Sequence, residues 1–368
     1  MKASKKYSLL GIGLLIISIS CCKEDDPITN NNYEYDPDTI SIVVPPFYPV
    51  PEMPADNPCT EQGVYLGRLL FYDNILSGDQ TMSCSSCHLP ANGFSDGKAV
   101  STGIDGIAGN RSSMPLVNLA YMFDGMFWDG RAETLEEQIL GPVPNPIELH
   151  LDWQTAVDRL SASELYKEKF YNAFGNQPIT KELVAKAVAQ FLRTMISFDA
   201  KYDYATRPGT GIQFTELEEE GRYLFFTENG LPSDAQCFHC HGGRLFTDNK
   251  YHNNGLTAAS SIADFPDKGR GEFTNSNIDA GRFKTPTLRN LAFTAPYMHD
   301  GRFATLEEVI DHYSHGIENS PTLDPLVGSS YTTGGELNFT AQQKAALIAF
   351  LNTLNDSTFI QNPAFQAP

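Results

Sequence analysis

Two short segments, Cys84-Ser-Ser-Cys87-His88 and Cys237-Phe-His-Cys240-His241, constrain this chain more than any other feature of its sequence. Each has the Cys-x-x-Cys-His spacing at which haem c is attached covalently. Both thiols then form thioethers with the haem, and the histidine becomes the proximal iron ligand. Neither segment has a second Cys/His pair nearby that would complete a zinc site. The sequence therefore predicts two covalently bound haem c groups, one at each segment.

An internal repeat surrounds the two segments. Gly67-Arg-Leu-Leu-Phe71 precedes the first, and Gly221-Arg-Tyr-Leu-Phe225 precedes the second at nearly the same distance. Downstream, Asp129-Gly-Arg-Ala-Glu-Thr-Leu-Glu-Glu-Gln-Ile139 matches Asp300-Gly-Arg-Phe-Ala-Thr-Leu-Glu-Glu-Val-Ile310 without a gap. This repeat predicts two haem domains of shared ancestry in one chain.

Hydrophobic residues recur at helical spacing along most of the chain, and no segment alternates as a half-buried strand would. Helices are predicted over 61–72, 134–141, 152–174, 180–199, 216–226, 305–315 and 340–354. The predicted fold class is all-α, with two tandem cytochrome c-like haem domains. The expected order is a signal peptide (1–22), a tether rich in Pro and Asn (23–54), a first haem domain (55–205), a second haem domain (206–356) and a C-terminal tail (357–368).

The N-terminus resembles that of an exported lipoprotein. Lys2, Lys5 and Lys6 precede a short apolar run that ends at Cys21 and Cys22, as in a secretory signal peptide. Either cysteine is a candidate for lipid attachment, and we expect contact with a membrane only through this anchor. Export suits the haem motifs, because haem c is attached outside the cytoplasm. We therefore expect a periplasmic or cell-envelope lipoprotein.

The chain is strongly acidic, with a formal net charge of −19 and a pI of about 4.7. This charge argues against binding to nucleic acid or to an anionic membrane surface. It suits a basic protein partner such as a small cytochrome, and a simple solvated surface explains it equally well.

In the second copy of the repeat, Thr305 and Glu308 form a capping box that starts a helix. The helical spacing puts Tyr313 on the apolar stripe of that helix and turns His312 and His315 elsewhere. Tyr313 is then either an ordinary core aromatic or the sixth ligand of the second haem iron, since a phenol oxygen is a known haem ligand. The spacing leaves both interpretations open.

In the first copy, Pro142 occupies the position that Tyr313 has in the second. Proline cannot bind iron, so the first haem is expected to have an open distal side. Gln138 puts an amide on an otherwise apolar helix face, where it needs a polar partner, and Glu148 follows a short turn later. An open iron beside an amide and a carboxylate suits chemistry on a small oxygen ligand. The alternative is that Glu148 is a surface residue.

Trp128 and His299 stand at equivalent positions, each directly before a repeated Asp-Gly-Arg. Trp128 is either a core side chain or an electron relay between the haems. We expect His299, like Pro142, to contact a haem.

Together these residues resemble the bacterial dihaem cytochrome c peroxidase family, which includes MauG-type enzymes. The resemblance covers residues 55–355 and rests on both haem motifs, Phe127-Trp-Asp-Gly-Arg131, the spacing of Gln138, Pro142 and Glu148, and Thr294-Ala-Pro-Tyr-Met-His-Asp-Gly301. It implies a peroxidatic N-terminal haem and an electron-transfer C-terminal haem. It implies that Gln138, Pro142 and Glu148 line the peroxide pocket and that Trp128 lies between the haems. It also implies a calcium ion held partly by the carbonyls of Thr294 and Pro296.

Three positions depart from the family pattern. Tyr313 stands where many members of the family have Met, and MauG-like members have Tyr at the same position. Asp105 stands near the position of a loop His that closes the first haem in other members. Ser113 stands where an Asn is common near the calcium, so the calcium site differs from that of most members.

These features predict an enzyme that reduces hydrogen peroxide to water with electrons from an external donor, such as a small cytochrome c. Glu148 is the expected acid/base catalyst, Gln138 orients the peroxide, and Trp128 relays electrons from the second haem. One alternative is MauG-like, peroxide-driven oxidation of a protein or organic substrate. Another is an electron-transfer lipoprotein without turnover of its own. The sequence leaves the donor, the substrate and the oligomeric state open, with a homodimer among the options.

Overall fold

The structure is a computed structural model that describes residues 35–46, 48–227, 235–327 and 336–368. The expected signal peptide, its lipidation cysteines and the first part of the tether lie outside the described residues. None of the described helices combines the length and the hydropathy needed to cross a bilayer.

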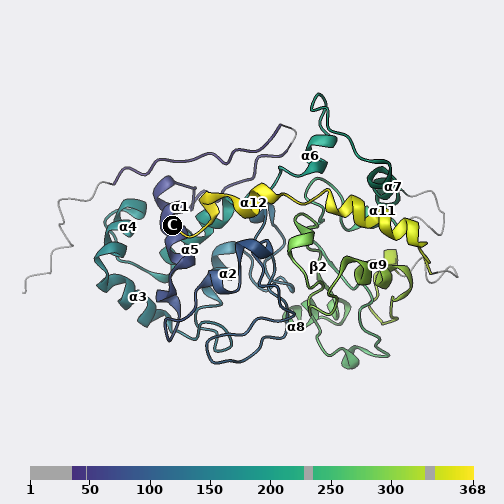
Figure 1. Ribbon diagram of the computed structural model, residues 1–368. Coiled ribbons are helices and arrows are strands. Elements are labelled where there is room, and N and C mark those ends of the chain that lie inside the picture. The colour runs from purple at the N-terminus through teal and green to yellow at the C-terminus, as the bar shows by residue number, and fades with distance from the viewer. Residues whose placement is uncertain (1–34, 47, 228–234, 328–335) are drawn as a thin grey trace, which may run out of the picture.

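A pair of packed helices organises each half of the molecule. α1 (Glu61–Tyr72) packs against α5 (Lys181–Arg193), and α7 (Glu216–Phe226) packs against α11 (Ala341–Asn352). Figure 1 shows the two pairs towards opposite ends of the molecule. A phenylalanine-rich core surrounds each pair, the first including Phe71 and Phe191 and the second including Phe225, Phe246 and Phe350.

The sequence pattern locates most helices correctly. α1, α7, α9 (Leu306–His315) and α11 agree with their predicted ranges to within two residues, as does the short α2 (Leu135–Leu140). The predicted helix 152–174 is wrong as a single element, because it is divided into α3 (Trp153–Ala162) and α4 (Glu164–Phe174). Ser163 ends α3, and its hydroxyl caps α4 by accepting a hydrogen bond from the Tyr166 N–H.

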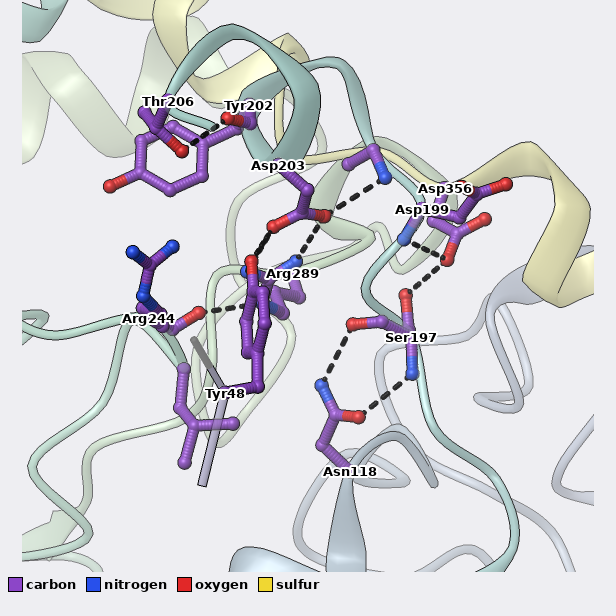
Figure 2. Close-up of polar contacts among 12 residues, drawn as sticks. Tyr48, Asn118, Ser197, Asp199, Tyr202, Asp203, Thr206, Arg244, Arg289 and Asp356 are labelled. Atoms are coloured by element: carbon purple, nitrogen blue, oxygen red, sulfur yellow. Dashed lines mark hydrogen bonds and ion pairs between the residues drawn. The ribbon is translucent and has the colours of Figure 1, made fainter. Parts of the chain in front are cut away.

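The predicted helix 180–199 is too long, because α5 ends at Arg193. Beyond it, the Ser197 N–H donates to Asn118 Oδ1 at 2.8 Å, and Asn118 Nδ2 donates back to the Ser197 carbonyl at 3.2 Å (Figure 2). Asn290 is the counterpart of Asn118 in the repeat, because Asn290-Leu-Ala-Phe293 matches Asn118-Leu-Ala-Tyr121. It donates to the Ser197 hydroxyl at 3.0 Å. Both asparagines have left-handed backbone conformations, with φ of 57° and 63°. The connecting segment is therefore held by both copies of the repeat, and these bonds replace helical ones.

The remaining elements are short. They are the helices α6 (Lys201–Ala205), α8 (Arg270–Thr274) and α12 (Ser357–Gln361), and the strands β1 (Tyr251–His252) and β2 (Phe283–Lys284). The two strands pair antiparallel. They do not overturn the predicted all-α class, and a two-residue strand is too short to show alternation in the sequence. The described chain is otherwise mainly helical.

The C-terminal tail returns to the first half of the molecule. Figure 1 shows the chain running from α11 through α12 to an end beside α1. Phe359 and Phe365 are buried in the first hydrophobic core. Arg68 of α1 donates to the carbonyls of Pro363 and Gln366 at 2.8 and 2.6 Å. The segment 357–368 therefore completes the core of the first half.

The described part of the expected tether also packs on the body of the protein. Thr39 forms an antiparallel bridge with Thr60. Tyr48 is buried, and its hydroxyl donates to the carboxylate of Asp203 on α6 (Figure 2). Arg289 donates to both oxygens of that carboxylate, at 2.8 and 3.0 Å. The proline-rich composition indicated an extended chain, and both a backbone bridge and a buried tyrosine attach that chain to the rest of the protein.

Candidate active site

The first haem motif forms a short 3-10 turn, Cys84–Ser86, followed by His88. His88 Nδ1 lies 2.8 Å from the carbonyl oxygen of Phe94, a residue with a left-handed backbone (φ 61°). A histidine that donates from Nδ1 keeps the Nε2 lone pair for a metal. Burial lowers the pKa of His88, which also favours the neutral ring. Neither Cys84 nor Cys87 is in a disulfide.

The second motif repeats this arrangement. Cys237–His239 is a 3-10 turn, and His241 Nδ1 lies 3.1 Å from the carbonyl of Phe246. Burial lowers the pKa of His241 to about 4. Cys237 and Cys240 are also free of disulfides. Both sets of residues therefore fit covalent haem c. Each offers two thiols and a neutral histidine whose Nδ1 is bonded to a main-chain carbonyl, which leaves Nε2 for the iron.

Glu148 lies beside the first haem motif. Burial raises the pKa of its carboxyl, although the hydrogen bond from Asn145 Nδ2, 2.7 Å from Oε1, and the charge of Arg131 oppose the rise. Burial is also the main cause of the raised pKa values of Cys84 and Cys87, and the Glu148 carboxylate adds to both. The carboxyl is therefore close enough to the attachment thiols to influence them, and it is not an exposed surface group.

Pro142 and Glu148 come together because the chain folds back after α2. The Leu149 N–H donates to the Pro142 carbonyl at 3.3 Å, and Leu151 N–H donates to Val143 at 2.8 Å. Gln138 is half-buried one helical turn before Pro142. Among the described residues, none forms a hydrogen bond with its side-chain amide. The three residues predicted to line one pocket therefore share one folded-back segment.

Asp105 lies in a loop beside this segment, since the Ile104 N–H donates to the Glu148 carbonyl at 3.0 Å. Its carboxylate is 2.5 Å from His150 Nδ1, and both side chains are exposed. The sequence pattern did not indicate this contact. It turns the imidazole of His150 towards the surface.

On the second side, Tyr313 projects from α9 towards the second motif. Burial raises the pKa of its phenol to about 12, with a smaller contribution from Cys240 and Cys237. Asn254 Nδ2 donates to the phenol oxygen at 3.0 Å and lies 3.6 Å from the sulfur of Met298. The Met298 thioether, a group that also serves as an axial ligand of haem c iron, is therefore a neighbour of the phenol and a second candidate for the sixth ligand.

The spacing puts His312 off the apolar stripe that carries Tyr313, and the structure shows that this second face of α9 is also covered. His312 is buried, and its Nε2 lies 3.0 Å from the carbonyl oxygen of Asn254. The loop that carries Asn254 covers a second face of α9, which the helical stripe alone could not indicate. His315 is exposed, as expected. Asn254 itself was missed, because nothing in a loop rich in Gly, Asn and Asp distinguishes it.

Trp128 and His299 lie where the two halves meet. Trp128 Nε1 donates to the carbonyl of Ser112 at 2.9 Å, and the Ser112 N–H donates to the carbonyl of His299 at 2.7 Å. The His299 ring stacks on Phe283, with ring centroids 3.5 Å apart and an angle of 10°. Burial lowers the pKa of His299 to about 4. The Lys284 N–H of β2 donates to the Trp128 carbonyl at 2.8 Å, so Trp128 is bonded to both halves.

Thr294 and Pro296 lie in the loop before the second Asp-Gly-Arg. The Ser113 hydroxyl donates to the Cys87 carbonyl at 2.9 Å, and is thus engaged with the first haem motif. In the part of the chain that the structure describes, no group of three or more His, Cys, Asp or Glu side chains is arranged to hold a metal ion. Calcium at the Thr294 and Pro296 carbonyls stays a prediction.

Known proteins support the same assignment. The family model for di-haem cytochrome c peroxidase matches residues 61–210. The chain is 36% identical over 305 residues to methylamine utilization protein MauG of Methylorubrum extorquens, covering 82% of this chain and 80% of that protein. It is 34% identical over 345 residues to cytochrome-c peroxidase IdrP1 of Pseudomonas sp. strain SCT, covering 85% of this chain and 86% of that protein.

The fold has a solved counterpart. A crystal structure of a MauG-like protein associated with microbial copper homeostasis superposes with a TM-score of 0.78 at 37% identity, covering 88% of this chain and 98% of that one. The diheme peroxidase BthA from Burkholderia thailandensis has a TM-score of 0.67 at 22% identity, covering 90% and 95% of the two chains, and shows the shared fold. With this identity along most of its length, the chain belongs to the di-haem cytochrome c peroxidase family, whose name denotes two c-type haems.

Proposed function

We propose that this protein reduces hydrogen peroxide to water with electrons from an external donor such as a small cytochrome c. The observation that carries the proposal is the half-buried carboxyl of Glu148, held by Asn145 beside the first pair of haem-attachment thiols, with its raised pKa. The first haem, which Cys84, Cys87 and His88 would hold, would supply the iron for peroxide and pass on the electrons of the donor. The chain supplies the proton transfer and the orientation.

Glu148 is the acid/base catalyst in this proposal. Burial keeps its proton available closer to neutral pH than that of an exposed glutamate, which suits transfer between the two peroxide oxygens. Asn145 holds one carboxyl oxygen at 2.7 Å and so orients the group. The amide of Gln138, to which no described residue forms a hydrogen bond, orients the peroxide. Pro142 offers no ligand atom, which keeps the distal side open.

Two tandem cytochrome c-like domains are the proposed architecture, with residues 55–205 as the peroxidatic domain and 206–356 as the electron-transfer domain. The repeated helix pairs and the repeated histidine–carbonyl bonds support it. Tyr313 is the proposed sixth ligand in the second domain. Trp128, bonded across the junction, is the proposed relay, and His299 and Pro142 the proposed haem contacts.

Three further assignments belong to this proposal. The protein is exported and held in the periplasm or cell envelope by lipid on Cys21 or Cys22, which the N-terminal sequence supports. A calcium ion binds at the carbonyls of Thr294 and Pro296, as the family resemblance suggests. A homodimer is the oligomeric state that belongs to this proposal.

A second candidate function is peroxide-driven oxidation of a protein or organic substrate. The phenol of Tyr313 favours it, because an anionic oxygen ligand stabilises high-valent iron, and two of the relatives named above are MauG or MauG-like. An electron carrier without turnover is less well supported, because such a protein needs neither Pro142 at the sixth-ligand position nor the half-buried Glu148 carboxyl.

The test is steady-state peroxide consumption by the holoprotein with reduced cytochrome c. General acid–base groups contribute about 10²–10⁴-fold, so Glu148→Gln is expected to lower the turnover by that range with both haem spectra intact. Glu133→Gln, at an exposed position shortly before α2, is the matched control and should leave turnover unchanged. Unchanged turnover in Glu148→Gln contradicts the assignment, and wild-type peroxide consumption only with an added organic substrate favours the second candidate.

A further inference from the structure

The side chain of Asn254 lies between two candidate ligands of the second haem iron. Its Nδ2 donates to the Tyr313 oxygen at 3.0 Å and lies 3.6 Å from the Met298 sulfur, within the range of an N–H···S contact. An amide nitrogen carries two hydrogens, so it has one for each neighbour. One side chain is thus in contact with both.

The main chain holds Asn254 independently of that amide. Its carbonyl accepts from His312 Nε2 on α9 at 3.0 Å. Asn253 Oδ1 accepts from the Gly255 N–H at 3.0 Å, and the Gly255 carbonyl accepts from the Glu318 N–H at 2.8 Å. Gly255 has a φ of 70°, and an added Cβ would lie 2.6 Å from Ile317. Side-chain substitutions at 254 therefore leave the bonds that position this loop.

Met298 is held in a similar way. Its φ of 76° is left-handed, and its carbonyl accepts from the Ser112 hydroxyl at 2.9 Å and from the Gly301 N–H at 3.2 Å. Both candidate ligands thus start from fixed backbone positions on either side of Asn254. The choice between them is then decided by side-chain chemistry.

We propose that Asn254 is a positioning residue that selects Tyr313 over Met298 as the axial ligand of the second haem, an inference that rests on the proposed assignment of Tyr313. A phenol oxygen bound to iron carries negative charge, whereas a thioether is neutral. Hydrogen bonds to a charged acceptor are roughly twice as strong as neutral ones. The amide of Asn254 therefore favours the Tyr313 oxygen as the iron ligand. Its second hydrogen bonds to the Met298 sulfur and holds that sulfur away from the iron.

The same hydrogen bond tunes the haem. A hydrogen bond to the phenolate stabilises its negative charge and at the same time reduces the electron density that it donates to iron, and such hydrogen bonds are one of the levers by which a protein sets the potential of a haem. The reduction potential of the second haem is therefore higher with Asn254 than it would be with an unbonded phenolate.

The experiment compares Asn254→Leu and Asn254→Asp in the full-length holoprotein by EPR, absorption spectrum and midpoint potential of the second haem. Asn254→Leu removes the donor and is expected to lower the potential. Asn254→Asp puts a second negative charge against the phenolate and is expected to change the ligand set seen by EPR. Adding Met298→Leu to Asn254→Asp should then change the spectrum again, because it removes the replacement ligand. Asn254→Gln retains an amide and is expected to restore the wild-type spectrum in part.

Asn319→Asp, which adds the same charge at an exposed position, is the control and should match the wild type. Tyr313→Phe is measured in parallel. If Tyr313→Phe leaves the second haem unchanged, the ligand assignment in the proposed function fails. If Tyr313→Phe alters that haem while Asn254→Leu and Asn254→Asp leave its spectrum and potential unchanged, the role of Asn254 alone is overturned.

Discussion

At the scale of single residues, histidine takes different roles here because its surroundings differ. His88 and His241 each turn Nδ1 to a main-chain carbonyl, and burial lowers both pKa values. His252 instead lies between two carboxylates, with Nε2 2.9 Å from Asp248 and Nδ1 2.7 Å from Asp324. The hydrogen bonds to Asp248 and Asp324 raise the pKa of His252 to about 9, although burial opposes this. The imidazolium therefore joins β1 to the loop that carries Asp324.

This ion cluster should make stability depend on pH. The pKa of His252 in the folded protein exceeds its ordinary value of 6.5, so its contribution is fully present below that pH and is lost as the pH rises through about 9. A shift of this size corresponds to at most about 3 kcal/mol. We expect the urea midpoint of the holoprotein to exceed that of His252→Asn at neutral pH. The gap should close towards a pH of about 10, and a gap of constant size contradicts this account.

At the scale of elements, close helix contact is the feature that recurs in both halves. An added Cβ at Gly67 would lie 1.9 Å from the Ala187 carbonyl oxygen, and at Gly221 it would lie 1.9 Å from that of Ala346. No side chain fits at such a contact, so each glycine allows its helix backbone to approach the partner helix. This explains why the repeated Gly-Arg-x-Leu-Phe begins with glycine.

Gly67→Ala and Gly221→Ala should therefore destabilise the protein to a similar degree. Each helix pair would have to separate, and overpacking of this kind typically costs about 1–3 kcal/mol. Urea unfolding of the holoprotein measures the effect. Gly109→Ala is the matched control, because an added Cβ there meets nothing nearer than 3.6 Å. If Gly67→Ala behaves like Gly109→Ala, the helices are not held apart by the added methyl group.

At the scale of the whole molecule, a buried ion pair joins segments that are distant in sequence. Arg289 and Asp203 have side-chain exposures of 0% and 1%, and Arg289 Nε also donates to the Arg244 carbonyl at 2.7 Å (Figure 2). Tyr48 donates to the same carboxylate from the N-terminal segment. The pair therefore links the N-terminal segment that carries Tyr48, α6 and the loop that follows the second haem motif.

Asp203→Asn should be strongly destabilising. It leaves the Arg289 guanidinium buried without its counter-charge, which typically costs about 3–5 kcal/mol. Tyr48→Phe removes one hydrogen bond and is expected to cost about 1 kcal/mol. Glu219→Gln breaks the exposed ion pair with Arg222 and should cost under about 1 kcal/mol. Thermal unfolding of the holoproteins ranks the three, and an equal loss for Asp203→Asn and Glu219→Gln would show that burial does not control this pair.

Local patterns in the sequence were sufficient for the haem motifs, for the repeat and for most helices. Cys-x-x-Cys-His requires only neighbouring residues, and a helix such as α7 follows from the spacing of its own apolar residues and from Thr215 as its cap. The repeat also showed that Pro142 is the counterpart of Tyr313, because the two copies align without a gap from Asp129 and Asp300 onwards. These inferences depend on contacts close in sequence, which the order of residues determines.

Only the tertiary structure decided contacts made between distant segments. Asn254 meets Tyr313, Arg289 meets Asp203, and Ser197 shortens α5 by bonding to Asn118. Such contacts depend on how loops fold over a core, and loop residues carry no periodic signal. A polar side chain in a loop can be exposed to solvent or buried, and the local sequence does not distinguish the two. Only the packing of other elements around it excludes water and determines its hydrogen-bond partner.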